Sequence, residues 1–350
     1  MPIFRLRDAA FFLLLAALTL AARAEKLRSP WDKVQVAIND SAYACPAAPA
    51  FAKTLTVDSY YIDKHASVVD QKKYEAFQAA SEAPTHLGQF AARAADAFLE
   101  KGSRAAALCL YSLLDAAAQA EAWTGKMPGF QGVYMQNWTL SGVAMAYLKV
   151  RPSGVGTPDQ EAHIRRWFRL LGGRVREYFD AEMKRLTPEN ENNHLYWAGL
   201  ALSAEGIAAN DSFGFQWGLA ACRQGLRNIQ PDGSLTAEMN RGQKAWHYHL
   251  YALGPLVMVA ELGAANGMDL YAEERGALHR LADFCIGILQ NPSLIEARAG
   301  AAQEVANPLG GLEVGWAVPY SHRFPDPRLA KLLAQAAWTG FWQWGGAPPQ

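Results

Sequence analysis

Apolar side chains recur at spacings of three and four residues along most of the chain after residue 72. Such spacings place the side chains on one face of an α-helix, which has about 3.6 residues per turn. Prolines and glycines interrupt the pattern repeatedly, and these residues commonly mark the ends of helices. The pattern predicts helices over residues 72–80, 86–101, 103–121, 138–150, 158–180, 192–208, 212–229, 241–264, 271–290 and 327–342.

Signals for β-strands are scarce, and residues 55–62 (LTVDSYYI) form the one stretch that merits consideration. The predicted helices are joined by short loops, which favours stacked antiparallel helical hairpins. The chain lacks the repeat of roughly 33–34 residues that is typical of helical-repeat solenoids. We therefore expect an all-α fold, an α/α toroid (an incomplete α/α barrel) whose inner helices line a cleft.

The first 24 residues are typical of a secretory signal peptide. Arg5 and Arg7 precede an apolar run over residues 9–20, and Ala22-Arg23-Ala24 has the small-x-small pattern of a cleavage site. The apolar run is shorter than the roughly 20 residues that span a bilayer. We therefore expect export to the periplasm, cleavage after Ala24 and no later membrane contact, with a single domain over residues 25–350.

The charge of the chain is balanced, with 33 basic and 33 acidic residues. Proteins that bind nucleic acids normally carry a basic surplus, so we expect no nucleic-acid partner. An anionic polysaccharide is compatible with this balance, because a local basic cleft attracts anions whatever the net charge.

Four cysteines are present: Cys45, Cys109, Cys222 and Cys285. Their spacing matches no zinc motif, so we expect no metal, and nothing in the sequence calls for another cofactor. Export permits disulfides. Cys45 lies in a proline-rich coil that a covalent tie would hold to the body, whereas Cys222 and Cys285 lie in apolar helical patterns and fit buried free thiols equally well.

Residues 190–200 (NENNHLYWAGL) combine polar and aromatic side chains at the start of an apolar helix. Asn193 and Trp197 are four residues apart and share one helix face, with His194 about 100° round from Asn193. Asparagine is also a favoured N-cap residue, so simple capping is the alternative interpretation. The clustering of an amide, an imidazole and an indole favours a functional site.

Residues 238–256 (EMNRGQKAWHYHLYALGPL) contain a second cluster. Arg241 and Tyr248 are seven residues apart, so on a helix they return to the same face within about 20°. His247 and His249 are two residues apart and point in nearly opposite directions on a helix, whereas metal-binding histidines of the HExxH motif are four apart. A shared metal is therefore disfavoured, and the alternative for Tyr248 is a core tyrosine.

An amide, an imidazole, a guanidinium and a phenol suit β-elimination of a 4-linked uronate. The reaction removes the weakly acidic C5 proton next to a carboxylate, and O4 is protonated as it leaves. Donors beside the carboxylate stabilise the charge that develops on it. Histidine or tyrosine transfers the protons, and an arginine next to the phenol is expected to lower its pKa.

The run NNHLYW, followed 47 residues after its histidine by R-x6-Y, resembles the bacterial periplasmic alginate (polymannuronate) lyases of polysaccharide lyase family 5. The similarity covers nearly the whole mature chain, including the Cys-Pro segment, the helix around Cys109 and residues 316–320. It implies an α/α toroid that cleaves polyuronates by β-elimination to unsaturated products. The chain also resembles members of the family that act on a broader range of polyuronates. We therefore expect polyglucuronate, as well as polymannuronate, to be a substrate.

The resemblance implies a role for each matched residue. Asn193 and Arg241 would neutralise the substrate carboxylate, His194 and Tyr248 would supply the base and the acid, and Trp197 would stack on a sugar ring.

The family also uses a lysine near the N-terminal side of the cleft, which lies in a Ser-Lys-Tyr run in alginate-specific members. The corresponding stretch here is DSYYIDK, residues 58–64, so Lys64 is expected to act from a shifted position with Tyr61 as a platform. A solvated surface lysine is the alternative. Further substrate contacts are expected at Tyr251, Gln136 and Arg323, for which helix capping (Gln136) and a surface position (Arg323) are the alternatives.

Two expectations concern the whole protein. Cys45 follows an irregular segment and Cys109 lies in an early helix, so we expect these two to form a disulfide. We also expect a monomer.

Two other functions compete with a lyase. A glycoside hydrolase on a similar toroid needs two carboxylates that face the sugar across the scissile bond, and Glu238 with Asp232 is the best pair in the chain. A non-catalytic polyuronate-binding or export-scaffold protein would use the same cleft without turnover.

Overall fold

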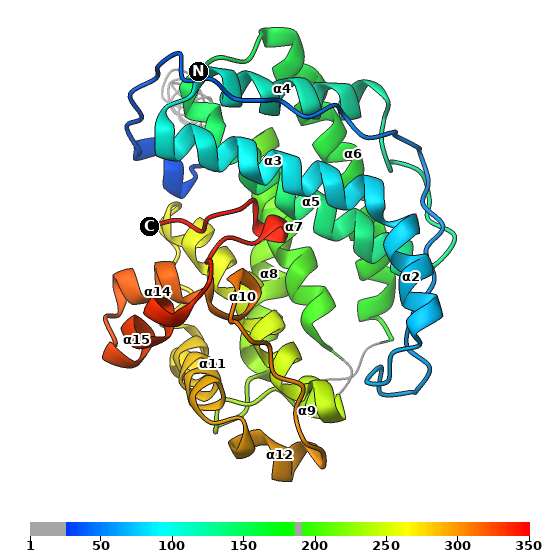
Figure 1. Ribbon diagram of the computed structural model, residues 1–350, viewed down its shortest axis with the longest axis vertical. Coiled ribbons are helices and arrows are strands. Elements are labelled where there is room, and N and C mark those ends of the chain that lie inside the picture. Colours follow the sequence, from blue (N-terminus) through cyan, green and yellow to red (C-terminus); the bar gives the residue numbers. More distant parts are fainter. Residues whose placement is uncertain (1–25, 186–190) are drawn as a thin grey trace, which may run out of the picture.

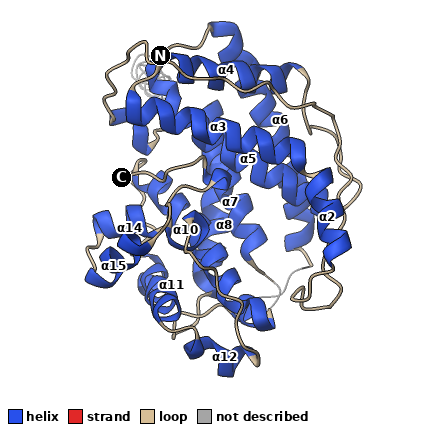
Figure 2. Ribbon diagram, in the orientation of Figure 1, coloured by secondary structure: helices blue, strands red, loops and turns tan. Residues whose placement is uncertain are grey.

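The protein is described by a computed structural model that covers residues 26–185 and 191–350, so the predicted signal peptide lies outside the described residues. Within these ranges the regular structure is helical, and strand pairing is limited to isolated bridges (Figure 2). The α-helices are α2 (Gln71–Ala80), α3 (Glu82–Lys101), α4 (Arg104–Gln119), α5 (Phe130–Val150), α6 (Pro158–Met183), α7 (Asn193–Ala209), α8 (Ser212–Asn228), α9 (Thr236–Met239), α10 (Ala245–Ala264), α11 (Glu273–Gln290), α12 (Ser293–Ala299), α13 (Gly311–Val314), α14 (Ala317–Arg323) and α15 (Pro327–Gln335). Short 3-10 helices are η1 (Pro30–Lys33), η2 (Arg151–Ser153), η3 (Gly242–Lys244) and η4 (Trp342–Trp344).

The longer helices pack as consecutive hairpins: α3 with α4, α5 with α6, α7 with α8, and α10 with α11 (Figure 1). Helices α5, α7 and α10 are apolar on nearly all sides and buried along most of their length. Helices α4, α6 and α8 keep one polar face in solvent. A helix that is apolar all round needs neighbours on every side. Helices α5, α7 and α10 are therefore the inner helices, and the all-α prediction is confirmed.

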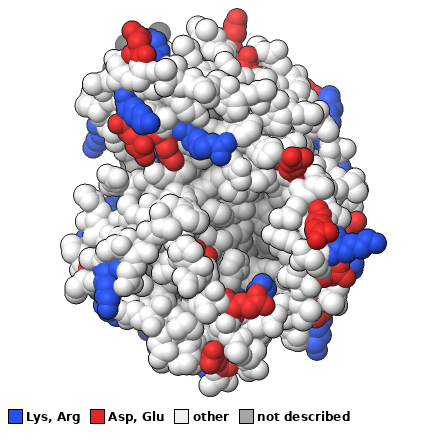
Figure 3. All heavy atoms as spheres, in the orientation of Figure 1, with Lys and Arg blue, Asp and Glu red and all other residues white. Residues whose placement is uncertain are grey.

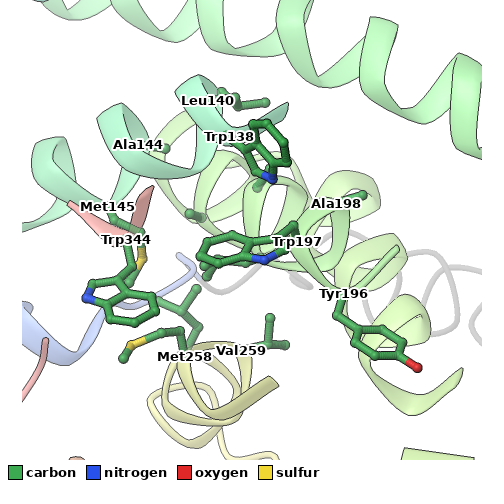
Figure 4. Packing of buried hydrophobic residues seen from close by; sticks show 14 of the residues in the cluster. Trp138, Leu140, Ala144, Met145, Tyr196, Trp197, Ala198, Met258, Val259 and Trp344 are labelled. Carbon is green, nitrogen blue, oxygen red and sulfur yellow. The ribbon is translucent and has the colours of Figure 1, made fainter. Parts of the chain in front are cut away.

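Tryptophans hold the inner helices together. Trp197 of α7 is fully buried and stacks on Trp344 of η4, with ring centroids 6.0 Å apart and an interplanar angle of 5°. Its indole N–H donates to the carbonyl of Tyr251 on α10 at 3.1 Å. Figure 4 shows Trp197 between the side chains of α5 and those of α10, which include Met258. The C-terminal segment thus completes the core between α5, α7 and α10.

The boundaries of most predicted helices agree with the structure within a few residues, but three regions differ. Residues 55–62 form no strand and make one isolated bridge, from Tyr61 to Val69. Helix α5 begins at Phe130 rather than at residue 138. Helix α15 ends at Gln335 rather than at residue 342, because the following chain turns inward to place η4 in the core.

The N-terminal coil runs over α4 and then descends to α2 (Figure 1). A disulfide joins Cys45 to Cys109 of α4, which confirms the predicted pair. The two cysteines are 64 residues apart, and a loop of this length corresponds to about 4 kcal/mol of stabilisation on the chain-entropy model. Cys222 and Cys285 are buried free thiols.

No helix in the described ranges combines the length and the apolar character that a membrane crossing requires. The single-domain organisation stays a prediction.

Candidate active site

A cleft of about 640 Å³ opens where the inner helices meet the coil before α2. Residues of α2, α3, α5 and α10 line it, together with Asn192 and His194 at the start of α7 and residues 341–343 near the C-terminus. Figure 3 shows a hollow in this face whose charged side chains lie mostly at its rim. Among the described residues, Glu82 and Arg241 are the acidic and basic side chains that line the cleft. A single guanidinium therefore supplies the permanent positive charge of its wall.

Tyr248 lines the cleft from the first turn of α10. The guanidinium carbon of Arg241 lies over the Tyr248 ring, 3.4 Å from its centroid. The Tyr248 hydroxyl is 2.5 Å from the hydroxyl of Tyr61, which comes from the coil across the cleft. Arg241 also donates from Nη2 to the carbonyl of Ala66 at 2.9 Å, so it ties the same coil to α10.

The predicted contact between Arg241 and Tyr248 is therefore present, but its predicted geometric basis is wrong. Arg241 precedes the short helix η3, and α10 begins only at Ala245. The two side chains meet because the turn before α10 folds the guanidinium back over the phenol, and not because they share a helical stripe.

Burial raises the pKa of Tyr248 to about 12, although the Arg241 guanidinium lowers it. A hydrogen bond from the Tyr61 hydroxyl lowers it further, because a donor to the phenolic oxygen stabilises the tyrosinate. The predicted direction of the arginine effect is correct, but burial outweighs it. Tyr248 is therefore protonated in the free cleft at neutral pH.

His194 lies in the first turn of α7 and stacks on Tyr134 of α5, with ring centroids 3.7 Å apart and an interplanar angle of 11°. Burial, assisted by the Arg241 charge, lowers the pKa of His194 to about 3. The imidazole is thus neutral, and its Nδ1 is a buried polar atom without a protein partner among the described residues.

Asn193 is fully buried and does not line the cleft. Its main-chain N–H and its Nδ2 both donate to Oε1 of Glu238, at 2.7 and 2.9 Å. Glu238 is also fully buried, and burial raises its pKa, while Arg241 and the bonds from Asn193 act in the opposite direction. Glu238 therefore joins the start of α7 to the turn that carries Arg241. Direct contact of Asn193 with a substrate would require a shift of this first turn and stays a prediction.

The chain is similar in sequence to known proteins. The family model described as alginate lyase matches residues 54–295. The chain belongs to the alginate lyase family. A protein named polysaccharide lyase from Stenotrophomonas maltophilia is 40% identical over 286 residues, which cover 81% of this chain and 83% of that protein. An alginate lyase from Azotobacter chroococcum is 31% identical over 303 residues, covering 84% and 80%.

Solved structures show the same fold. An alginate lyase A1-III variant complexed with a tetrasaccharide superposes with a TM-score of 0.79 at 21% identity, covering 93% of this chain and 96% of that one. Alginate lyase A1-III from Sphingomonas species A1 gives a TM-score of 0.74 at 23% identity, covering 95% and 91%. The predicted α/α toroid is thereby confirmed, and the chain is a polysaccharide lyase.

The alginate lyase fold does not bring every predicted site residue to the cleft. Trp197 is fully buried among aromatic rings, so its predicted stacking on a sugar is wrong. Gln136 is buried, donates to the carbonyl of Trp123 and is not among the residues that line the cleft. Arg323 forms a paired contact with Glu261, at 2.7 and 2.8 Å, outside the cleft lining. Neither Gln136 nor Arg323 therefore lines the cleft, and their substrate contacts stay predictions.

Of the three remaining residues predicted to contact the substrate, two line the cleft and one does not. Tyr61 and Tyr251 both line the cleft, and the Tyr251 hydroxyl donates to Oε1 of Gln343 at 2.8 Å. Lys64 is exposed on the same coil as Tyr61 and is not among the lining residues. The structure gives Lys64 no contact that distinguishes it from a solvated lysine.

Helix α5 carries a row of aromatic residues on the cleft wall that was not predicted from the sequence. Phe130, Tyr134 and Trp138 are spaced four residues apart and all line the cleft. The i, i+4 spacing of these rings was a readable signal. It went unused because the helix was predicted to start only at Trp138.

The carboxylates required for a hydrolase do not face each other across the cleft. Glu238 is buried behind Asn193. Asp232 is bound to Arg298 at 2.6 Å in a separate outer groove. His249 is buried as well, with Nδ1 bound to the carbonyl of Ala245 and Nε2 accepting from the N–H of Leu235. Its nitrogens are therefore engaged in the fold and not paired with His247 around a metal.

Proposed function

We propose that this lyase cleaves 4-linked polyuronates, polymannuronate (alginate) and polyglucuronate, by syn β-elimination, with Tyr248 as the proton-transfer residue. The observation that carries the proposal is the stacked Arg241–Tyr248 pair, with the guanidinium 3.4 Å from the ring centroid, in a cleft otherwise poor in charge. Family membership supports the substrate class, because several relatives are named alginate lyases.

Tyr248 first takes the C5 proton and then delivers a proton to O4 on the same face of the sugar. In the free enzyme the phenol is protonated, so Tyr248 first releases its proton to solvent water. Arg241 and the Tyr61 hydroxyl stabilise the resulting tyrosinate, which then takes the C5 proton. Arg241 also neutralises the carboxylate, whose negative charge increases as the C5 proton departs. The bond from C4 to O4 breaks, and C4 and C5 become doubly bonded.

His194 acts as a neutral group in this scheme. Its pKa of about 3 makes it a weak base, so C5 deprotonation is assigned to Tyr248. The place of His194 on the cleft wall, stacked on Tyr134, suits a hydrogen bond from the imidazole that orients the sugar. Asn193 and Glu238 hold the turn that presents His194.

The substrate range follows from sugar stereochemistry. Mannuronate and glucuronate differ only at C2, whereas the reacting atoms are at C4 and C5. One set of groups therefore serves both sugars, and contacts to O2 determine the preference between them. Guluronate has the opposite configuration at C5, which moves the proton to the other face of the ring, so polyguluronate should be the poorest substrate.

We also propose a location and an oligomeric state for the enzyme. The basic, apolar and small-residue pattern of residues 1–24 supports export to the periplasm. We propose a monomer there, because the cleft described above is built from a single chain.

The experiment is an ultraviolet absorbance assay for the unsaturated uronate, with polymannuronate, polyglucuronate, hyaluronan and polyguluronate as substrates. We expect product from the first two and least from polyguluronate. Polymer shortening without ultraviolet absorbance would indicate a hydrolase. Binding without any product would indicate a non-catalytic polyuronate-binding protein.

A further inference from the structure

A second groove, of about 350 Å³, adjoins the catalytic cleft. Gln89, Phe341 and Trp342 line both the cleft and this groove, so the two hollows share a wall. Its other lining residues come from α3 and from the last turns of the chain, and include Arg93 and Trp338. Its volume falls near the lower end of the roughly 300–1,000 Å³ typical of small-molecule sites.

Trp338 is unusual because it is 59% exposed, whereas most tryptophans of this protein are buried. Its indole lies against Gly310, where a Cβ would come within 2.8 Å of the ring. The neighbouring Ala337 N–H donates to the carbonyl of Leu309 at 3.0 Å, which holds this stretch of backbone in place. One side of the ring is therefore supported by bare backbone, and much of the ring remains open to solvent.

Arg93 supplies a positive charge to the same groove. It is exposed on α3, and its guanidinium lies 5.1 Å from the centroid of the Phe90 ring. Among the described residues it forms no ion pair with an acidic side chain. The acid of the groove, Asp96, is already bound to Lys149 at 2.6 Å and to the N–H of Ala347 at 2.9 Å. Arg93 is thus a cation without a protein anion.

We propose that this groove is a distal subsite of the cleft, in which a uronate of a long substrate chain stacks on Trp338 and a carboxylate of that chain pairs with Arg93. The inference rests on the proposed function for the identity of the ligand. The shared lining residues place the groove next to the cleft, within reach of a long polymer bound there. The open indole offers a flat apolar face for a pyranose ring, and Arg93 complements the charge of a uronate. The reacting sugar itself remains at Tyr248.

The test compares a long polymer with the shortest oligomer that the wild-type enzyme cleaves. Trp338→Ala and Arg93→Gln should each raise KM for the polymer about fivefold and change kcat little, which corresponds to about 1 kcal/mol of lost binding. Neither should alter kinetics on the shortest oligomer, which does not reach the groove. Added salt should abolish the effect of Arg93→Gln and leave that of Trp338→Ala, since salt screens exposed charges.

Phe213 and Arg176 provide a matched control pair. Phe213 is 62% exposed on α8, the Arg176 guanidinium lies 4.7 Å from its ring centroid, and neither residue lines the cleft or the groove. Phe213→Ala and Arg176→Gln should behave like wild type on both substrates. An unchanged KM for the polymer in the Trp338 and Arg93 variants, or an equal rise on the shortest oligomer, would overturn the distal subsite.

A second experiment distinguishes failure of the proposed lyase activity from failure of the distal subsite. If the wild-type protein forms no unsaturated product, affinity electrophoresis in gels that contain polymannuronate tests whether the groove binds the polymer. The subsite predicts that the Trp338 and Arg93 variants are retarded less than wild type and than the Phe213 control. Equal retardation of all variants would refute it.

Discussion

The two walls of the cleft are built in different ways. The helical wall carries His194 and Tyr248 at the starts of α7 and α10, which are buried along most of their length. The coil wall carries Tyr60 and Tyr61, and its turn is held by the Asp63 carboxylate, which accepts the N–H groups of residues 65, 67 and 68.

Few bonds join the coil wall to the helical wall. Arg241 donates to Ala66, Gln243 donates to the carbonyl of Ser67 at 3.1 Å, and the hydroxyls of Tyr61 and Tyr248 meet. Segments held by few, partly exposed bonds open more readily than buried helices. We therefore propose that residues of the helical wall carry out the chemistry and that the coil wall acts through Tyr248.

The largest effect is expected at Tyr248. Tyr248→Phe keeps the ring that packs under Arg241 but removes the only atom that carries the proton. We expect kcat to fall about 10³-fold or more, near the range for general acid–base groups, with a melting temperature close to wild type. Tyr196→Phe, a buried tyrosine of α7 outside the cleft lining, is the matched control. More than roughly a tenth of wild-type turnover on both polymannuronate and polyglucuronate would mean that Tyr248 only packs.

Arg241 should come next. Arg241→Ala removes the positive charge of the helical wall, and kcat should fall about 10²-fold while binding of a non-cleaved oligomer weakens much less. Arg298→Ala, which removes an arginine bound to Asp232 outside the cleft, should leave kcat unchanged. Near-normal kcat with a raised KM would show that Arg241 binds the ground-state carboxylate only.

The walls should also differ in their response to acid. Burial lowers the pKa of His249, on α10, to about 4, despite its bond to Ala245. Below about pH 6.5, His249 binds a proton in the unfolded chain, whereas in the folded chain it stays neutral until the pH approaches 4. The free energy of unfolding therefore decreases as the pH falls from about 6.5 towards 4. We expect about 2 kcal/mol less stability at pH 5 than at pH 8 from this residue.

Thermal unfolding at both pH values measures this effect. His249→Gln should show a shallower loss of stability than wild type between pH 8 and pH 5. His65→Gln, on the exposed turn of the coil wall, should follow wild type. An unchanged pH dependence in His249→Gln would contradict the assignment.

The smallest effect is expected on the coil wall. Tyr61→Phe removes the hydroxyl 2.5 Å from that of Tyr248 and with it a bond that lowers the pKa of the catalytic phenol. The tyrosinate becomes less accessible, and kcat should fall about tenfold, equivalent to about 1.4 kcal/mol. Tyr43→Phe, on the N-terminal coil outside the cleft lining, should be neutral. A loss as large as that of Tyr248→Phe would mean that the coil wall itself takes part in the chemistry.

The same division explains what the sequence could and could not predict. The helical wall could be predicted from the sequence because the apolar periodicity located α7 and α10. The resemblance then assigned roles to His194 and Tyr248. Irregular residues 59–69 have no periodicity, so the hydroxyl contact of Tyr61 could not be read from the pattern. Its predicted role as a sugar platform instead came from the resemblance.

The errors within the helices have a physical cause as well. Helix α7 is buried on nearly all sides, so spacing alone cannot tell a position facing the cleft from one facing the core. Trp197 was therefore placed on the substrate, although it lies in the core. Asn192, and not Asn193, caps α7, since its side chain accepts from the N–H of His194 at 3.0 Å. Two adjacent asparagines give no local signal that separates the two positions.

The central claim is that Tyr248 performs the proton transfer and that Tyr61 acts only through it. A double-mutant cycle on kcat tests this directly, with Tyr61→Phe introduced into the wild type and into Tyr248→Phe. We predict a loss of about tenfold in the wild type and no further loss in Tyr248→Phe, because the hydroxyl that Tyr61 stabilises is already gone. A tenfold loss in both backgrounds would show that Tyr61 acts independently of Tyr248 and would contradict the account.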